Sequence, residues 1–149
     1  PQNPKTPVLS SIINMRRQPD LSCKVFCIGT AGVGKTSLIL RYKQGFLNKN
    51  EYLSTIGTNI EMKKIEAYGL LTKISFMDTA GQERYGAMAK NSFQGTEGIF
   101  IVYDCTDEES FTRVNEWIKN YDQVVEPHCE SVLVANKCDL TEKRKITKE

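Results

Sequence analysis

The chain has 149 residues, which is enough for one α/β core of ordinary size. Its mean hydropathy is −0.40 and no apolar run approaches the length of a bilayer, so we expect neither a membrane-spanning segment nor a signal peptide. The formal net charge is +2, and the first twenty residues account for it, so nothing indicates a surface for nucleic acid.

Residues 1–20 are expected to form an N-terminal tail, because prolines stand at positions 1, 4, 7 and 19. Such a segment buries too little apolar surface to fold alone, and we favour a flexible arm. An amphipathic turn that touches a membrane is the alternative, built from Val8, Leu9, Ile12 and Ile13. The domain itself is expected over residues 21–149.

A glycine-rich loop follows the first expected strand. An apolar run over 22–28 is typical of a buried strand, and a helix with one apolar face is expected over 35–45. The loop between this strand and this helix, together with the first two residues of the helix, reads Gly29, Thr30, Ala31, Gly32, Val33, Gly34, Lys35 and Thr36. A strand that leads through a glycine-rich turn into a helix is the context of a phosphate-binding loop.

The residue types in this loop fit a polyphosphate chemically. Glycines let successive backbone N–H groups point inward, and the start of the helix adds positive potential. Lys35 supplies a charge to the outer phosphates, and the Thr36 hydroxyl supplies an oxygen to Mg²⁺. The loop predicts a nucleoside triphosphate site without indicating the base.

A hairpin follows, with strands expected over 58–67 and 70–77 and a turn at Tyr68-Gly69. Its second strand delivers Asp78 to the carboxyl end, where this side chain can hold Mg²⁺ through water.

Three residues near the hairpin suit the terminal phosphate. Thr55 could complete the Mg²⁺ shell when a γ-phosphate is present. Gly81 permits close backbone approach to that phosphate, and Gln82 can orient a water for in-line attack.

The remaining elements alternate between helix and strand. They are expected near 86–93 (helix), over 98–104 (strand), 108–126 (helix) and 131–136 (strand). The helix over 108–126 is the best defined, because Thr106 and Glu109 form a capping box and Pro127 stops it. The sole histidine, His128, then falls in a loop and is not expected to be catalytic.

The last strand leads into a base-recognition motif, Asn136-Lys137-Cys138-Asp139. The Asp139 carboxylate can accept two hydrogen bonds from guanine, whereas adenine offers no such donor pair and would leave it unpaired. Lys137 can lie over the purine plane through its aliphatic stem, and Asn136 can tie the motif to the phosphate loop.

Strands and helices in this order predict an α/β fold with a mostly parallel sheet, helices on both faces and binding beyond the carboxyl ends of the strands. The four motifs, at Gly29 to Thr36, Thr55, Asp78 to Gln82 and Asn136 to Asp139, resemble those of the Ras superfamily of small GTPases, most closely the Rab branch. The resemblance covers roughly residues 21–149 and implies a P-loop small G-domain with one antiparallel edge strand.

The resemblance also implies a GTP/GDP switch, with slow unaided hydrolysis, in vesicle and membrane trafficking. Exchange factors, GTPase-activating proteins and effectors would act through residues 46–59 and 79–93. It assigns catalysis to Gln82 and Lys35, and Mg²⁺ binding to Thr36, Thr55 and Asp78. It assigns nucleotide contacts to Gly29, Ala31, Gly32, Val33, Gly34, Lys35, Thr36, Ser37, Phe46, Thr55, Gly81, Asn136, Lys137 and Asp139.

The sequence departs from the Rab pattern at Met77, Asn59-Ile60 and Phe93, so the resemblance does not transfer an effector or a compartment. The family's sixth strand, final helix and prenylated cysteine are not visible before Glu149. We therefore expect a fragment or an incomplete domain with the fifth strand at an exposed edge, and membrane association only if a missing C-terminus is prenylated.

Two function classes stay open. The favoured one is a hydrolysing regulatory GTPase, and the other is a nucleotide-binding interaction module without productive hydrolysis. An ATP-dependent kinase is a distant third, because the base motif would then have no purpose. The five cysteines lack metal-ligand spacing and are typical of free thiols in a reducing cytosol, so we expect a cytoplasmic location, with the cytosolic face of an endomembrane as the narrower alternative.

Overall fold

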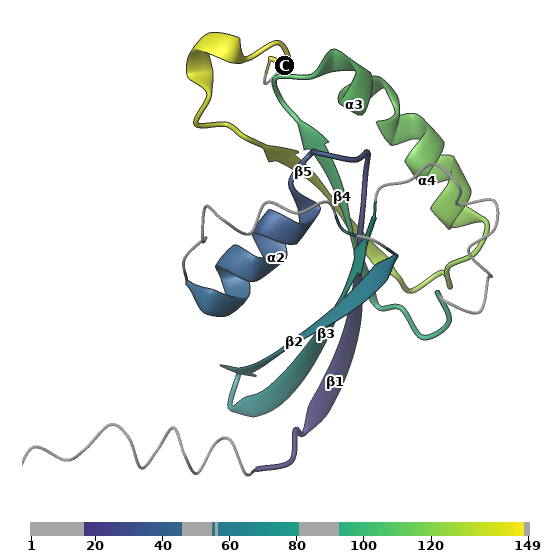
Figure 1. Cartoon of the computed structure of the whole chain (residues 1–149). Coiled ribbons are helices and arrows are strands. Elements are labelled where there is room, and N and C mark those ends of the chain that lie inside the picture. The colour runs from purple at the N-terminus through teal and green to yellow at the C-terminus, as the bar shows by residue number, and fades with distance from the viewer. Residues whose placement is uncertain (1–16, 46–54, 56, 81–92, 148–149) are drawn as a thin grey trace, which may run out of the picture.

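A computed structural model describes residues 17–45, 55, 57–80 and 93–147, which form one mixed sheet with helices on its two faces (Figure 1). The strands are β1 (Leu21–Ile28), β2 (Thr58–Ala67), β3 (Leu70–Thr79), β4 (Gly98–Asp104) and β5 (Glu130–Asn136). The helices are α2 (Lys35–Gln44), α3 (Glu108–Thr112), α4 (Val114–Asp122) and the 3₁₀ helix η4 (Thr141–Lys143).

The strands lie in the order β2-β3-β1-β4-β5. β1 pairs in parallel with β3 and β4, and β4 pairs in parallel with β5. Among the strands that the structure describes, only β2 runs antiparallel, beside β3 at the edge of the sheet. This topology confirms the predicted mostly parallel sheet with one antiparallel edge strand, and it brings the carboxyl ends of four strands to one edge.

The two faces of the sheet carry separate apolar clusters, because successive residues of a strand point to opposite faces. Phe26 of β1 belongs to the cluster that includes Trp117 of α4, whereas its neighbours Val25 and Cys27 pack with Ile39 of α2. In Figure 1, α2 accordingly covers one face, and α3 and α4 cover the other. This arrangement confirms the prediction of helices on both faces.

Glycines delimit α2 at both ends. Gly34 precedes the helix with φ of +96°, and Gly45 follows it with φ of +80°. The Gly45 N–H donates a 2.9 Å hydrogen bond to Arg41 O, which satisfies a carbonyl at the end of the helix. The expected span of 35–45 is thus right except that Gly45 is the cap.

The helix predicted over 108–126 is wrong as a continuous element, because the chain turns at Arg113 between α3 and α4, and α4 ends at Asp122. The capping box at Thr106 is also wrong. Asp107, with extended backbone, is the N-cap, and its Oδ1 accepts a 3.1 Å hydrogen bond from Glu109 N.

The other elements agree closely with expectation, and the predicted hairpin turn is confirmed, with φ of +54° at Tyr68 and +76° at Gly69. The strands expected over 22–28, 70–77 and 131–136 extend by one or two residues. The helix expected near 86–93 lies outside the described residues except for Phe93.

β5 is an edge strand in the described sheet, as predicted. Its residues Val132 and Leu133 are each about half exposed. A pocket of about 420 Å³ opens between α2 and the sheet, and its lining is mostly apolar, including Tyr42, Phe100 and Val134. This pocket lies on a face of the sheet, not at the edge where the motifs meet.

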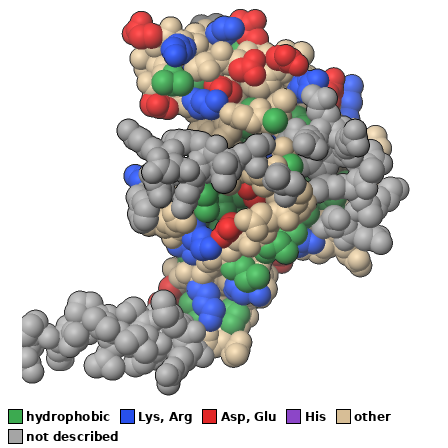
Figure 2. Space-filling view, in the orientation of Figure 1, with side chains coloured by type: hydrophobic (Ala, Val, Ile, Leu, Met, Phe, Trp, Pro, Cys, Tyr) green, Lys and Arg blue, Asp and Glu red, His purple; other side chains and the backbone are tan. Residues whose placement is uncertain are grey.

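On the face drawn in Figure 2, Lys and Arg side chains are interspersed with Asp and Glu. All five cysteines are free thiols. Within the described ranges, no helix combines the length and the apolar character that crossing a bilayer would require.

Candidate functional site

The phosphate loop follows β1 at the carboxyl edge of the sheet, and two of its glycines are required by close approaches. A Cβ on Gly29 would lie 2.1 Å from Val102 O of β4. A Cβ on Gly34 would lie 2.4 Å from Asn136 Nδ2. Only residues without side chains let the loop lie this close to β4 and to the base motif.

The Lys35 ammonium lies inside the loop. Its Nζ donates hydrogen bonds to Gly29 O at 2.8 Å and to Thr30 O at 2.9 Å, and the residue is 5% exposed. Burial lowers the pKa of Lys35 to about 8, against the opposing effect of the negative charge of Asp78. An anion in the loop would favour the charged form of this lysine.

Three oxygen-bearing side chains converge beside the loop. The hydroxyl oxygens of Thr36 and Thr55 lie 2.6 Å apart, and Thr36 donates a 2.6 Å hydrogen bond to Asp78 Oδ2. Thr55 Oγ1 is 3.4 Å from the same carboxylate oxygen. The structure thus brings together the three residues that the sequence assigns to Mg²⁺.

Asp78 carries a buried oxygen, Oδ1, for which the described residues supply no hydrogen-bond partner. Burial raises the pKa of Asp78, while the hydrogen bond from Thr36 and the charge of Lys35 act in the opposite direction. A buried acceptor without a partner next to two hydroxyl oxygens is a donor set that suits a hard cation. These residues fit a magnesium ion.

The base motif begins at the last residue of β5. Asn136 Nδ2 donates a 2.7 Å hydrogen bond to Val33 O, which confirms the predicted tie to the phosphate loop. Lys137 adopts φ of +58°, and its Nζ lies 2.6 Å from Asp104 Oδ2. Asp139 is exposed in the turn that follows.

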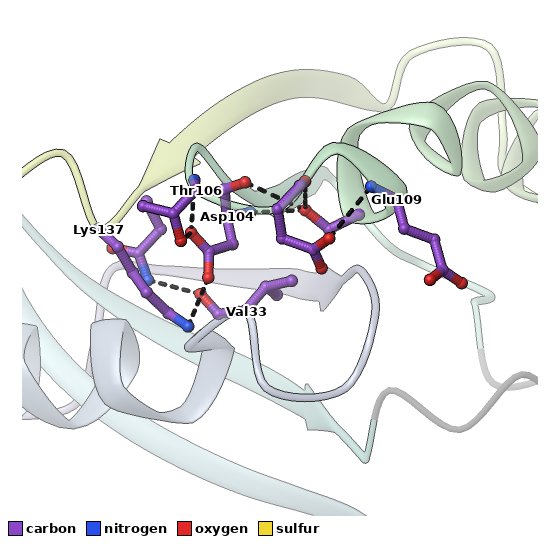
Figure 3. Close-up of polar contacts among 8 residues, drawn as sticks. Val33, Asp104, Thr106, Glu109 and Lys137 are labelled. Carbon is purple, nitrogen blue, oxygen red and sulfur yellow. Dashed lines mark hydrogen bonds and ion pairs between the residues drawn. The ribbon is translucent and has the colours of Figure 1, made fainter. Parts of the chain in front are cut away.

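Sequence reasoning missed Asp104 and Thr106 as neighbours of this site. Figure 3 shows Asp104 between Thr106 and Lys137, close to Val33. Burial would raise the pKa of Asp104, but hydrogen bonds from Lys137 and Thr106 outweigh it and lower the pKa below its ordinary value. The available signal was that Asp104 ends a buried strand at the same edge as the motifs.

Several predicted site residues fall outside the described part of the chain. Phe46, Gly81 and Gln82 are among them, as are most of the segments 46–59 and 79–93. Of the remaining loop residues, Ala31 and Gly32 are exposed, Val33 is buried and Ser37 is half-buried.

His128 is exposed in a turn, 3.6 Å from Glu126, which confirms that it is a loop residue. Among the residues that the structure describes, no three His, Cys, Asp or Glu side chains cluster as metal ligands. The candidate cation site therefore depends on hydroxyl oxygens as well as the Asp78 carboxylate.

Comparison with known proteins identifies the family to which the sequence is related. A sequence model described as "Ras family" matches residues 24–149. The chain is 40% identical over 135 residues to Ras-related protein Rab-13 of Mesocricetus auratus, which covers 91% of this chain and 66% of that protein. It is also 40% identical over 132 residues to GTP-binding protein YPT1 of Saccharomyces cerevisiae, which covers 89% of this chain and 64% of that protein.

A plant relative, Ras-related protein RABD2a of Arabidopsis thaliana, is 40% identical over 135 residues. The match covers 91% of this chain and 66% of the relative, so the chain spans just under two thirds of the length of these proteins.

Proposed function

Because the chain belongs to the Ras family and is Rab-like, we propose that it is a small GTP-binding protein that switches between a GTP-bound and a GDP-bound form. The observation that carries this proposal is the hydrogen bond between Asn136 and Val33. It joins the base motif to the phosphate loop, which supports a single nucleotide site that spans both motifs.

The phosphate end of the nucleotide is proposed to lie in the loop between β1 and α2. Backbone N–H groups of Gly32, Gly34 and their neighbours would donate to phosphate oxygens at the start of the helix. Lys35 would turn its ammonium from the carbonyl oxygens of the loop to the outer phosphates, which are stronger acceptors.

Thr36, Thr55 and Asp78 are proposed to hold magnesium, with Asp78 acting through water. A bound magnesium ion would neutralise charge on the phosphate oxygens. The buried Oδ1 atom of Asp78, which lacks a partner among the described residues, supports this assignment.

The base end of the site is proposed to select guanine. Asp139 would accept hydrogen bonds from the two donors on the guanine edge, and the Lys137 stem would lie against the purine plane. Adenine would leave the Asp139 carboxylate without these donors, and such a mismatch discriminates strongly. Phe46 is proposed to stack on the opposite side of the base.

The switch itself is proposed to involve the segments 46–59 and 79–93. With GTP bound, Thr55 and Gly81 would contact the γ-phosphate and hold these segments in one shape that effectors recognise. Gln82 would orient the attacking water, and hydrolysis would release the contacts. Exchange factors and activating proteins are proposed to act on the same segments, in membrane trafficking at the cytosolic face of an endomembrane.

Unaided hydrolysis is proposed to be slow. In Ras, which serves as the general example of this chemistry, an activating protein accelerates hydrolysis by about 10⁵-fold, or roughly 7 kcal/mol. The same dependence is proposed for this chain.

Titration calorimetry tests the binding step. We expect the chain to bind GDP in the presence of Mg²⁺ and to bind ADP far more weakly. Equal affinity for the two ligands would refute selective guanine recognition. The Asp139→Asn variant is expected to lose the preference for GDP over ADP. The amide replaces one acceptor oxygen of the carboxylate with an NH₂ donor, which would face a donor of guanine.

Phosphate release with GTP as substrate tests the catalytic step. The wild-type chain should release phosphate slowly, and an activating protein for Rab GTPases should accelerate it. Gln82→Leu should suppress the stimulated rate, whereas an unchanged rate would remove Gln82 from the mechanism. Nucleotide binding without any stimulated release would favour the interaction module.

A further inference from the structure

An ion pair between Asp104 and Lys137 joins the end of β4 to the base motif. The Asp104 side chain is 8% exposed, whereas the Lys137 side chain is 34% exposed, and Nζ lies 2.6 Å from Oδ2. Figure 3 shows the two side chains meeting near Val33 of the phosphate loop. The carboxylate is thus the enclosed partner, and the lysine is the partner that remains open to a ligand.

Asp104 is held firmly on the sheet. Its Oδ1 accepts hydrogen bonds from Thr106 N at 2.8 Å and from Thr106 Oγ1 at 2.7 Å. Its backbone N–H donates a 3.0 Å hydrogen bond to Ser110 Oγ. Both carboxylate oxygens are therefore engaged, and the side chain cannot rotate without breaking charged hydrogen bonds.

The backbone of Lys137 is fixed on both sides. Its φ of +58° lies in the left-handed region, which residues other than glycine rarely adopt. Its carbonyl oxygen accepts a 3.1 Å hydrogen bond from Leu140 N. Asn136, the preceding residue, is anchored to Val33. The main freedom left in this residue is rotation along the lysine stem, and Asp104 holds the end of that stem.

We propose that Asp104 is a positioning residue of the base site, because it holds the Lys137 ammonium and so orders the lysine stem before a purine binds. This inference rests on the proposed function, in which that stem lies against the base. A free lysine stem samples many rotamers, and ordering it in advance lowers the entropy lost on binding. Asp104 itself need not touch the nucleotide.

The Asp104→Asn variant is the direct test. Asparagine keeps the shape and the oxygen that accepts from Thr106, but it removes the charge that holds Lys137. We expect release of radiolabelled GDP, measured in the presence of Mg²⁺, to accelerate on the order of 10-fold, which corresponds to about 1.4 kcal/mol.

A second nucleotide separates positioning from base reading. A lysine stem packs on any purine plane, so Asp104→Asn should accelerate the release of GDP and of inosine diphosphate by the same factor. Inosine lacks the exocyclic amine of guanine. Asp139→Asn should therefore change the ratio between the two release rates, whereas Asp104→Asn should preserve it.

Asp107→Ala is the matched structural control. It removes the N-cap of α3, three residues away, and should lower the midpoint of urea denaturation, as loss of an N-cap generally does. Its GDP release rate should stay at the wild-type value. If Asp104→Asn does not fold, Lys137→Met, which keeps the stem but frees its end, should show the accelerated release.

An unchanged GDP release rate in Asp104→Asn, or in Lys137→Met where the first variant does not fold, would overturn the inference and leave the proposed function standing. An equal acceleration in Asp107→Ala would also overturn it, because loss of local stability alone would then suffice. Failure of the wild-type chain to bind GDP would instead refute the proposed function, and this inference with it.

Discussion

The hydroxyl oxygens of Thr36 and Thr55 lie 2.6 Å apart, although the two residues are 19 positions apart in the chain. Thr36 stands at the start of α2, and Thr55 lies ahead of β2, so two separate parts of the chain bring these oxygens to Asp78. These hydroxyl oxygens meet beside a carboxylate whose buried Oδ1 has no hydrogen-bond partner among the described residues, and a hard cation would complete such a site. Magnesium dependence is therefore the first property to test.

Asp78→Asn should make nucleotide binding insensitive to magnesium. The amide keeps an acceptor for Thr36 but loses the negative charge, so Mg²⁺ affinity should fall by about 10–100-fold, as for other residues that hold a metal through its outer shell. GDP release in Mg²⁺ should then match release in EDTA. Asp122→Asn, at the far end of α4, should retain the wild-type response to EDTA. A full EDTA response in Asp78→Asn would contradict the assignment.

Two glycines of the phosphate loop should tolerate alanine very differently. Gly29→Ala would place a Cβ 2.1 Å from a backbone oxygen of β4, whereas a Cβ on Gly32 would meet no atom of the described residues within 4 Å. Both have positive φ, so Gly32→Ala should cost about 1–2 kcal/mol from backbone strain alone. Gly29→Ala should lower the free energy of unfolding by more than about 4 kcal/mol, because the backbone of the loop or of β4 must move to relieve the clash. Urea denaturation measures both, and equal losses would show that the loop adapts.

Local patterns were sufficient to predict the fold of this chain and one of its long-range contacts. The strand, glycine turn and helix around Lys35 are contiguous, so the sequence carries the whole arrangement. The contact from Asn136 to Val33 followed because both residues end up at the carboxyl edge of one parallel sheet. Topology thus extended a local motif to a distant one.

The features that sequence reasoning missed depend on details beyond periodicity. Apolar spacing continues across Arg113, so the pattern does not reveal the turn that separates α3 from α4. Thr106 can cap a helix or bind a carboxylate, and the second option needs Asp104 close to it. The partner of Lys137 likewise depends on the pairing of β4 with β5, which spacing along the chain does not specify.

Acid should weaken the contribution of Asp104 to stability. Its pKa is lowered in the folded chain, so the folded state favours the charged form and the unfolded state binds the proton more readily. The contribution is therefore present above the ordinary pKa of 3.8 and is lost as the pH falls through the folded value.

Asp104→Asn should consequently be less stable than wild type by about 1–2 kcal/mol at neutral pH, the loss of a charged hydrogen bond. The difference in free energy of unfolding should stay constant above pH 3.8 and shrink below it. Urea denaturation at a series of pH values measures this difference. If the free energies of unfolding of wild type and Asp104→Asn fell in parallel through the acid range, the Asp104 carboxylate would titrate alike in the folded and unfolded states.

Thiol reactivity should single out the base motif. Cys138 is exposed in the turn after β5, whereas Cys27 and Cys105 are 2% and 0% exposed. Burial raises the pKa of Cys27 to about 12, against a smaller lowering effect of Lys35, so its reactive thiolate is scarce at neutral pH. A disulfide reagent such as Ellman's should react rapidly with one thiol of the native chain and with all five after denaturation. Cys138→Ser should abolish the rapid phase, and Cys27→Ser should leave it intact. A rapid phase that persists without Cys138 would contradict this prediction, because another thiol, such as half-buried Cys23 or Cys129, would then react as fast.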